Sequence, residues 1–207
     1  MSEKTKFPGQ LPESETRLEA PPASGAPEAA AWVQAGIKTL VRETIESVRI
    51  DRLAEQLGVP ERQFYENFAD QDGLHAAVLD RWLYKTTVGI IERAENEGTT
   101  PQKKLRRLLE LPFWSTKIGL AADLELAIRD WARRSSQTHE SVQHADNLRL
   151  KYLNTLFESM DFDPMETEIR AHVAYALVRY LTQNCHLGEP VLRRIVQTSM
   201  DLHLSTR

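Results

Sequence analysis

Residues 47–74, SVRIDRLAEQLGVPERQFYENFADQDGL, decide the fold because they hold two short apolar sets with a break between them. Leu53 and Leu57 belong to the first set, and Phe64 and Phe68 belong to the second. Each set has the spacing of one buried helix face. The stretch therefore predicts two short helices, and these four apolar side chains are expected in the core.

The break between the two helices has the composition of a tight turn. Gly58 stands where the first helix must stop, and glycine adopts the positive φ of that position without strain. Pro60 follows at a position that suits the first residue of the second helix. Two helices joined by a short glycine-containing turn form a helix-turn-helix, whose second helix can enter the major groove of DNA.

The segments on either side of this pair complete a three-helix head. Residues 28–45 show the apolar spacing of a helix with one buried stripe, which includes Trp32 and Leu40. This helix is expected to cover the core side chains that the pair leaves open. Residues 70–73 then supply an N-cap and an acidic first turn for a long helix that runs to about residue 97.

The composition favours an all-α protein. The chain has 207 residues and is rich in Leu, Ala, Glu and Arg, with only nine glycines. Residues 1–27 hold five of the ten prolines and few apolar side chains, which predicts a disordered tail. No apolar run is long enough to span a membrane, no secretory signal is visible, and Cys185 is the single cysteine. These features favour a cytoplasmic location.

A helical bundle is expected after the head. Apolar stripes and helix-breaking residues predict helices at about residues 101–109, from Thr116 or Asp123 to about 134, and at 137–160, 165–185 and 191–204. The last two helices carry more apolar width than one neighbouring helix covers, so a second copy could pack against them in a twofold homodimer. Alternatively, both stripes face the core of the same chain.

Several motifs in this order resemble one protein family. The segments VRIDRLAEQLGV, ERQFYENF and DQDGLHAAVLDRW resemble the DNA-binding domain of TetR-type transcriptional regulators, from Glu28 to about Trp82. LELAIRDWARR and RLKYL also resemble the ligand-binding half of one TetR subgroup. The resemblance implies a homodimer with a DNA-binding domain at residues 28–75 and a ligand-binding and dimerisation domain at residues 76–207. In such proteins a small molecule in the body changes the spacing of the two heads.

Six residues in and near the second short helix are the candidates for contact with a palindromic double-stranded operator: Arg49, Glu61, Arg62, Gln63, Tyr65 and Asn67. Residues 61–63 could read bases, because glutamate accepts from cytosine, arginine pairs with guanine and glutamine pairs with adenine. The other three could hold phosphates. Tyr65 and Asn67 could equally lie against the surface of the head without touching DNA.

The charge of the head opposes tight binding to nucleic acid. Residues 28–75 hold nine acidic and five basic side chains, a local net charge of −4. Phosphate contacts supply most of the nonspecific affinity for DNA and scale with the cations that make them. The head is therefore expected to hold DNA weakly, with a shallow dependence on salt.

A ligand pocket in the body is expected where aromatic side chains could converge around a polar anchor: Trp82, Phe113, Trp114, Trp131, Tyr152, His172 and Tyr175. Aromatic stripes at helical spacing are more often ordinary core, so each residue has that alternative. No histidine pair has metal-ligand spacing on one helix face, and no glycine-rich phosphate loop follows a strand. No cofactor, metal site or enzymatic activity is expected.

Together these features predict a ligand-responsive DNA-binding transcriptional regulator, a repressor released by a small apolar or aromatic effector. The alternative is an all-α dimeric module for protein interaction or small-molecule binding, whose acidic helix-turn-helix head no longer binds an operator.

Overall fold

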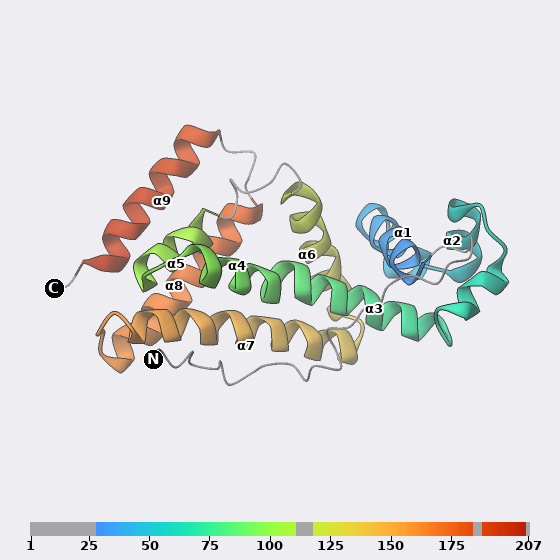
Figure 1. Cartoon of the computed structure of the whole chain (residues 1–207), viewed down its shortest axis with the longest axis horizontal. Coiled ribbons are helices and arrows are strands. Elements are labelled where there is room, and N and C mark those ends of the chain that lie inside the picture. Colours follow the sequence, from blue (N-terminus) through green and yellow to red (C-terminus); the bar gives the residue numbers. More distant parts are fainter. Residues whose placement is uncertain (1–27, 111–117, 184–187, 206–207) are drawn as a thin grey trace.

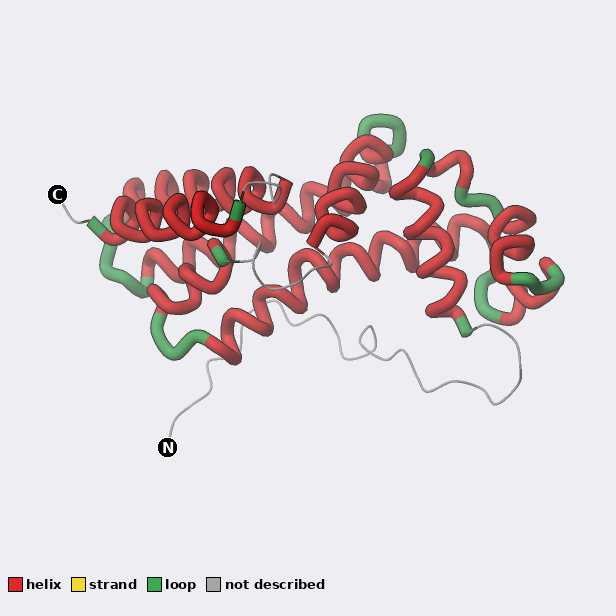
Figure 2. Tube along the Cα trace, turned by 90° about the horizontal axis from the view of Figure 1, so that it is seen from above, coloured by secondary structure: helices red, strands yellow, loops and turns green. Residues whose placement is uncertain are grey.

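Every regular element in the described part of the chain is a helix (Figures 1 and 2). The computed structural model describes residues 28–110, 118–183 and 188–205. The all-α prediction is confirmed within these ranges. The predicted tail of residues 1–27 and two aromatic candidates, Phe113 and Trp114, lie outside them.

The head begins with one longer helix and three short helical segments, which are α1 (Ala29–Arg42), η1 (Ile45–Ser47), α2 (Ile50–Leu57) and η2 (Glu61–Glu66). Trp32, Leu53 and Phe64 are all completely buried at its centre, as the apolar spacing predicted. Leu57 and Phe68 are partly buried and pack against the same core. The head is therefore built on the apolar side chains that the sequence indicated.

The turn between α2 and η2 has the predicted geometry at its glycine. Gly58 has φ 70° and ψ 33°, and its N–H donates to the carbonyls of Ala54 and Glu55. Pro60 differs from the prediction, because it is an extended residue ahead of η2 with ψ 143°. The second helix starts one residue later and is a 3₁₀ helix of six residues.

A long helical rod connects the head to the body. It consists of α3 (Gln71–Leu83), η3 (Tyr84–Val88) and α4 (Gly89–Glu97), which follow one another without a break (Figure 1). Asp70 caps the start of α3, since its carboxylate accepts a hydrogen bond of 2.8 Å from the N–H of Gly73. The predicted helix to residue 97 is thus confirmed. The π-helical conformation of η3 was not predicted.

The body packs five further helices around the far half of the rod: α5 (Pro101–Leu109), α6 (Ile118–Ala132), α7 (Ser136–Glu158), α8 (Pro164–Gln183) and α9 (Glu189–Leu204). Figure 1 shows α7 running along the rod and α9 at the end of the body away from the head. Arg170 ties the last turn of α9 to α8, because its guanidinium donates to the carbonyls of Leu202, His203 and Ser205.

The core of the head continues into the body. Leu124, Ile128 and Trp131 of α6 belong to the same buried cluster as Trp32 and Phe64. A second cluster fills the rest of the body between the rod and α5, α7, α8 and α9. The boundary expected between residues 75 and 76 falls inside α3. A displacement of α6 or of the rod would therefore change how the head is held.

Candidate functional site

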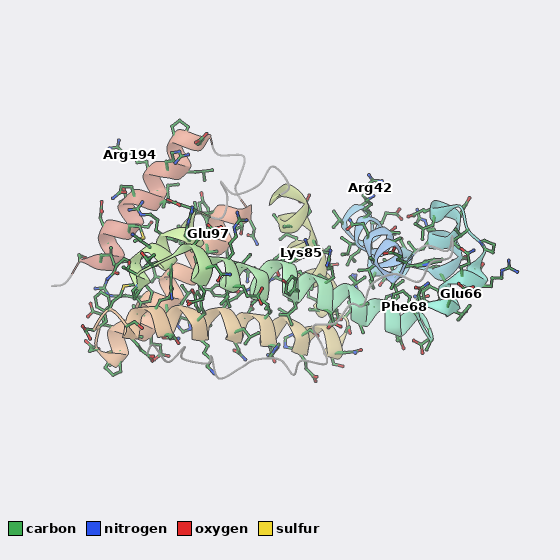
Figure 3. All side chains as sticks on the ribbon, in the orientation of Figure 1. Arg42, Glu66, Phe68, Lys85, Glu97 and Arg194 are labelled. Atoms are coloured by element: carbon green, nitrogen blue, oxygen red, sulfur yellow. The ribbon has the colours of Figure 1, made fainter. Side chains whose placement is uncertain are left out.

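The outward face of η2 is the candidate surface for DNA. Phe64 holds this short helix down, with its ring 5.3 Å from that of Trp32. Glu61 and Arg62 are exposed, and Tyr65 is 60% exposed although its ring lies edge-on to that of Phe64, with the ring centroids 5.3 Å apart. In Figure 3 the neighbouring Glu66 and Phe68 lie in the head, on the side of the molecule opposite Arg194 of α9. Arg49 is exposed as well, so four of the six candidate residues are accessible on the head.

Gln63 and Asn67 are less available than the sequence suggested. Both are half-buried. The side-chain oxygen of Gln63 is buried and has no hydrogen-bond partner among the described residues. Asn67 donates from its amide to the backbone carbonyl of Gln63 at 3.0 Å. The Asn67 amide therefore closes the end of η2, and Gln63 would have to rotate outward before it could read a base.

The cations of the head are partly neutralised within the head itself. Arg49 donates to the Asp51 carboxylate at 3.2 and 2.7 Å, and Arg52 donates to Glu43 at 2.6 Å from both terminal nitrogens. Arg62 makes no ion pair with a described carboxylate. A phosphate that approached Arg49 would have to compete with Asp51. This competition would lower the affinity for DNA in the direction expected from the local charge.

A cavity of about 150 Å³ lies in the body beside the rod. Its walls come from η3, α4, α5, α6, α7 and α8, so every helix of the body except α9 contributes. Most of the lining is apolar and includes Ile90, Ile91, Leu108, Leu153 and Val178. A small molecule with an apolar body could bind in this cavity.

A buried ion pair forms the polar wall of the cavity. Arg149 on α7 donates from both terminal nitrogens to the two carboxylate oxygens of Glu125 on α6, at 3.0 and 3.1 Å. Each side chain is only 13% exposed. Burial alone would raise the pKa of Glu125, but the Arg149 hydrogen bonds and charge outweigh it, aided by Arg129, and lower the pKa from 4.5 to about 2. Glu125 is therefore ionised at neutral pH.

The same ion pair fastens the rod to the body. Arg149 donates from Nε to the hydroxyl of Thr87 and from Nη2 to that of Thr86, both at 2.9 Å. The indole N–H of Trp82 donates to Glu125 at 2.8 Å. Both threonines lie in the π-helical segment η3, and π-helical turns occur frequently at functional sites. The wall of the cavity and the helix that leads to the head are thus joined by direct hydrogen bonds.

A second pair extends the network to α8. Arg129 donates to both carboxylate oxygens of Asp146, and the hydroxyl of Tyr175 also donates to Asp146. Burial opposes ionisation of Asp146, but Arg129 and the Tyr175 hydrogen bond lower its pKa overall. Burial raises the pKa of Tyr175, which keeps its hydroxyl protonated as a donor. Side chains from α6, α7 and α8 therefore form one polar cluster with the rod, and its charged groups are all hydrogen-bonded.

The structure separates the aromatic candidates for ligand binding. Tyr152 and Tyr175 line the cavity. Trp82 is completely buried beside it and holds Glu125, whereas Trp131 packs with its ring 5.3 Å from that of His75, in the core shared with the head. His172 is exposed and its ring contacts the carbonyl of Glu168 at 2.9 Å. These last three residues are not among those that line the cavity, and we do not assign them to it.

Sequence reasoning missed the charged residues of this wall. A signal was present, because Glu125 and Arg129 are four apart and Asp146 and Arg149 are three apart, spacings that place each pair on one helix face. Charges at such spacing usually lie in solvent. The packing of α6 against α7 brings the two pairs together and buries them.

The described residues contain no cluster of three or more histidine, cysteine or acidic side chains that could hold a metal ion. Among the described helices, none is both long and apolar enough to cross a membrane.

The architecture matches that of solved structures of TetR-like transcriptional regulators, which confirms the expected fold. A transcriptional regulator from Rhodococcus sp. RHA1 superposes with a TM-score of 0.65 at 17% identity, covering 86% of this chain and 94% of the other. A TetR-like regulator from the same organism gives 0.64 at 17% identity, over 87% and 99% of the two chains. FadR from Bacillus subtilis, solved with stearoyl-CoA, gives 0.63 at 15% identity, over 86% and 98%. No family model and no curated protein matches the sequence.

Proposed function

We propose that this protein is a ligand-responsive DNA-binding transcriptional regulator, a homodimeric repressor released by a small effector with an apolar or aromatic body. One observation carries the proposal: a single rod supplies core residues of the helix-turn-helix head at one end and a wall of the cavity at the other. Leu74 and Val78 of α3 are buried in the head core. Thr86, Thr87 and Ile90, further along the rod, line the cavity.

Coupling between the two sites would pass through Arg149. An effector that draws Arg149 away from Thr86 and Thr87 changes how η3 is held against α7. Because η3 continues directly into α3, the head moves with it. An effector needs only to favour one position of the rod over the other by about 1–3 kcal/mol to change operator affinity five- to 150-fold.

The head would read DNA with the accessible tip of η2. Arg62 is exposed and free of a carboxylate partner among the described residues, so it is the first candidate for a guanine contact. Glu61 could accept from cytosine beside it, and Tyr65 could reach a phosphate. Arg49 would add a phosphate contact after release from Asp51, while Gln63 and Asn67 would need to give up their present orientation.

Two heads require a dimer, and α8 presents a face for one. Met165, Ile169, Val173 and Tyr180 lie along one side of α8 and are between 49% and 73% exposed. Leu202 of α9 is 68% exposed. The opposite sides of α8 and α9 are buried within the body. One part of the apolar surface of these helices therefore faces the core of the same chain, and another part is left for a second copy. A twofold copy on the exposed face would form an isologous four-helix interface.

The proposal is tested by fluorescence anisotropy with DNA from upstream of the protein's own gene, at low and at moderate salt. The wild type is expected to bind one palindromic segment as a dimer. Arg62→Ala should weaken binding by about 1–3 kcal/mol and relax the base preference at one position of each half-site. Lys103→Ala removes an exposed cation of α5, at the end of the body away from the head (Figure 1), and is the control that should bind as the wild type does.

Two results would count against the proposal. If Arg62→Ala leaves both affinity and base preference unchanged, η2 does not read bases through this residue. If no DNA binds even at low salt, the acidic head has lost operator binding, and an all-α interaction or small-molecule-binding module becomes the better description. Transcription from a reporter carrying the bound segment, with and without the protein, distinguishes a repressor from an activator.

A further inference from the structure

We propose that the effector is a small carboxylic acid, with one aromatic ring or a similarly compact apolar body inside the cavity and its carboxylate held by Lys85 and Arg179. This inference rests on the proposed function and specifies the ligand of the same cavity. The shape, the lining and the charges of the cavity support it separately.

The volume limits the apolar part of the ligand. The cavity measures about 150 Å³, and an apolar protein cavity of roughly that size accommodates one benzene molecule. Ile90 and Ile91 on α4, Leu108 on α5 and Leu153 on α7 supply apolar contacts from three sides of the rod and body. A single ring or a short branched chain fills this space, whereas part of a long acyl chain would lie outside it.

The charges of the lining favour an anion. Four charged side chains line the cavity: Lys85, Glu125, Arg149 and Arg179. Glu125 and Arg149 neutralise each other through their bidentate pair. The remaining two are both cations, and neither forms an ion pair with any carboxylate in the described part of the chain. The lining therefore carries an uncompensated charge of two positive units that an anionic ligand would balance.

The two cations are placed at different walls of the same cavity. Lys85 belongs to η3 on the rod and is exposed, and Figure 3 shows it on the half of the body that faces the head. Arg179 belongs to α8, is half-buried, and lies with its guanidinium carbon 5.9 Å from the centre of the Tyr175 ring. Tyr175 is also a member of the Asp146 cluster. An anion bound by both cations would link α8 directly to the rod.

A carboxylate fits this pair of cations for a chemical reason. A guanidinium presents two parallel N–H groups that match the two oxygens of a carboxylate, and the lysine ammonium adds a flexible point charge. Gln183 offers a further side-chain amide on the α8 side, whereas the Thr182 hydroxyl already donates to the carbonyls of Val178 and Arg179. A neutral ligand of the same shape would fill the apolar part equally well but would leave both cations unpaired.

The test is isothermal titration calorimetry of the full-length protein, without DNA, against benzoate and phenylacetate. Benzamide, benzyl alcohol and benzylamine serve as neutral and cationic probes of similar size. At least one acid is expected to bind at one site per chain, at least about tenfold tighter than its neutral counterpart, since hydrogen bonds to charged groups contribute that much. Added salt should weaken the acid and leave the neutral probe unchanged.

Charge-removing variants separate the carboxylate contact from the apolar contact. Lys85→Gln combined with Arg179→Gln should reduce acid affinity to that of the neutral probe, without changing the affinity for the neutral probe itself. Arg194→Gln removes an exposed cation outside the cavity and should bind the acid as the wild type does. Ala122→Trp fills the cavity and should abolish binding of every probe. Thermal melts by circular dichroism confirm that each variant is folded.

The ligand inference is overturned if acids and neutral probes bind equally, if the double variant keeps the preference for acids, or if no acid binds. Because the titration contains no DNA, this failure is distinct from failure of the regulator proposal. A protein that binds its operator but no carboxylic acid keeps the proposed function and loses this ligand class. A protein that binds the acid but no DNA keeps the ligand class and loses the regulator function.

Discussion

The buried pair of Glu125 and Arg149 should contribute strongly to stability, and replacing Arg149 with methionine tests this. Methionine replaces the aliphatic stem of arginine with an unbranched apolar side chain but removes the guanidinium, so Glu125 loses its principal partner. The pKa of Glu125 falls from 4.5 to about 2 in the folded protein. At 1.36 kcal/mol per unit, this corresponds to about 3 kcal/mol of favourable interaction, of which Arg149 supplies the largest part. Breaking one partner of a buried pair typically costs about 3–5 kcal/mol.

We therefore expect Arg149→Met to lower the free energy of unfolding at pH 7 by about 3 kcal/mol, measured by urea denaturation. The pH dependence gives a second check. A depressed carboxylate pKa contributes stability that is complete above the unfolded value of 4.5 and is lost as the pH falls toward about 2. Without Arg149 the burial of Glu125 raises its pKa relative to the wild type. The stability gap between variant and wild type should therefore narrow as the pH is lowered.

Two further variants make the measurement specific. Arg149→Met combined with Glu125→Gln removes the unpaired charge and should recover a large part of the lost stability. Arg193→Met disrupts an arginine–glutamate pair whose two side chains are 63% and 62% exposed, and it should change stability by no more than about 0.5 kcal/mol. The reasoning is refuted if Arg149→Met resembles Arg193→Met, or if its stability gap stays constant from pH 7 to pH 4.

Three other perturbations give equally definite outcomes. Gly58→Ala should lower the unfolding free energy by about 1 kcal/mol in urea denaturation, because alanine is strained at φ 70° although nothing obstructs its Cβ; an unchanged midpoint would contradict this. Asp51→Asn should release Arg49 and raise DNA affinity in anisotropy titrations. The dependence of log affinity on log salt concentration should become steeper by about one unit. An unchanged dependence would exclude Arg49 from phosphate contact. Glutamate in place of Ile169 or Val173 should shift the protein toward monomer in light scattering; an intact dimer would place the interface elsewhere.

The head was predictable from the sequence because its geometry is encoded locally. Apolar spacing placed Leu53 and Phe64 in the core, and the backbone freedom of Gly58 placed the turn. The predictions that were wrong concern positions at which two local conformations are both favourable. Pro60 is compatible with both an extended residue and a first helical residue, and the packing of Phe64 beneath Trp32 accompanies the extended form.

The candidate ligand site was predictable only in part. The sequence indicated that aromatic residues of the body would surround a cavity, and Tyr152 and Tyr175 do line it. Periodicity identifies the buried face of each helix, but it does not specify which buried faces enclose a space and which fill one another. Trp131 illustrates this limit, because it lies on the buried face of α6 and packs toward the head.

The sequence by itself determined that the chain is helical, where the helix-turn-helix lies, and which side chains form its core, because these features depend on neighbours within one or two turns. Only the tertiary structure decided that Glu125 and Arg149, which are 24 residues apart, form a buried ion pair. The same arginine also donates a hydrogen bond to the π-helical segment of the rod. Long-range polar contacts depend on the crossing angle and register of packed helices. The same charged residues at the same spacing would otherwise lie in water.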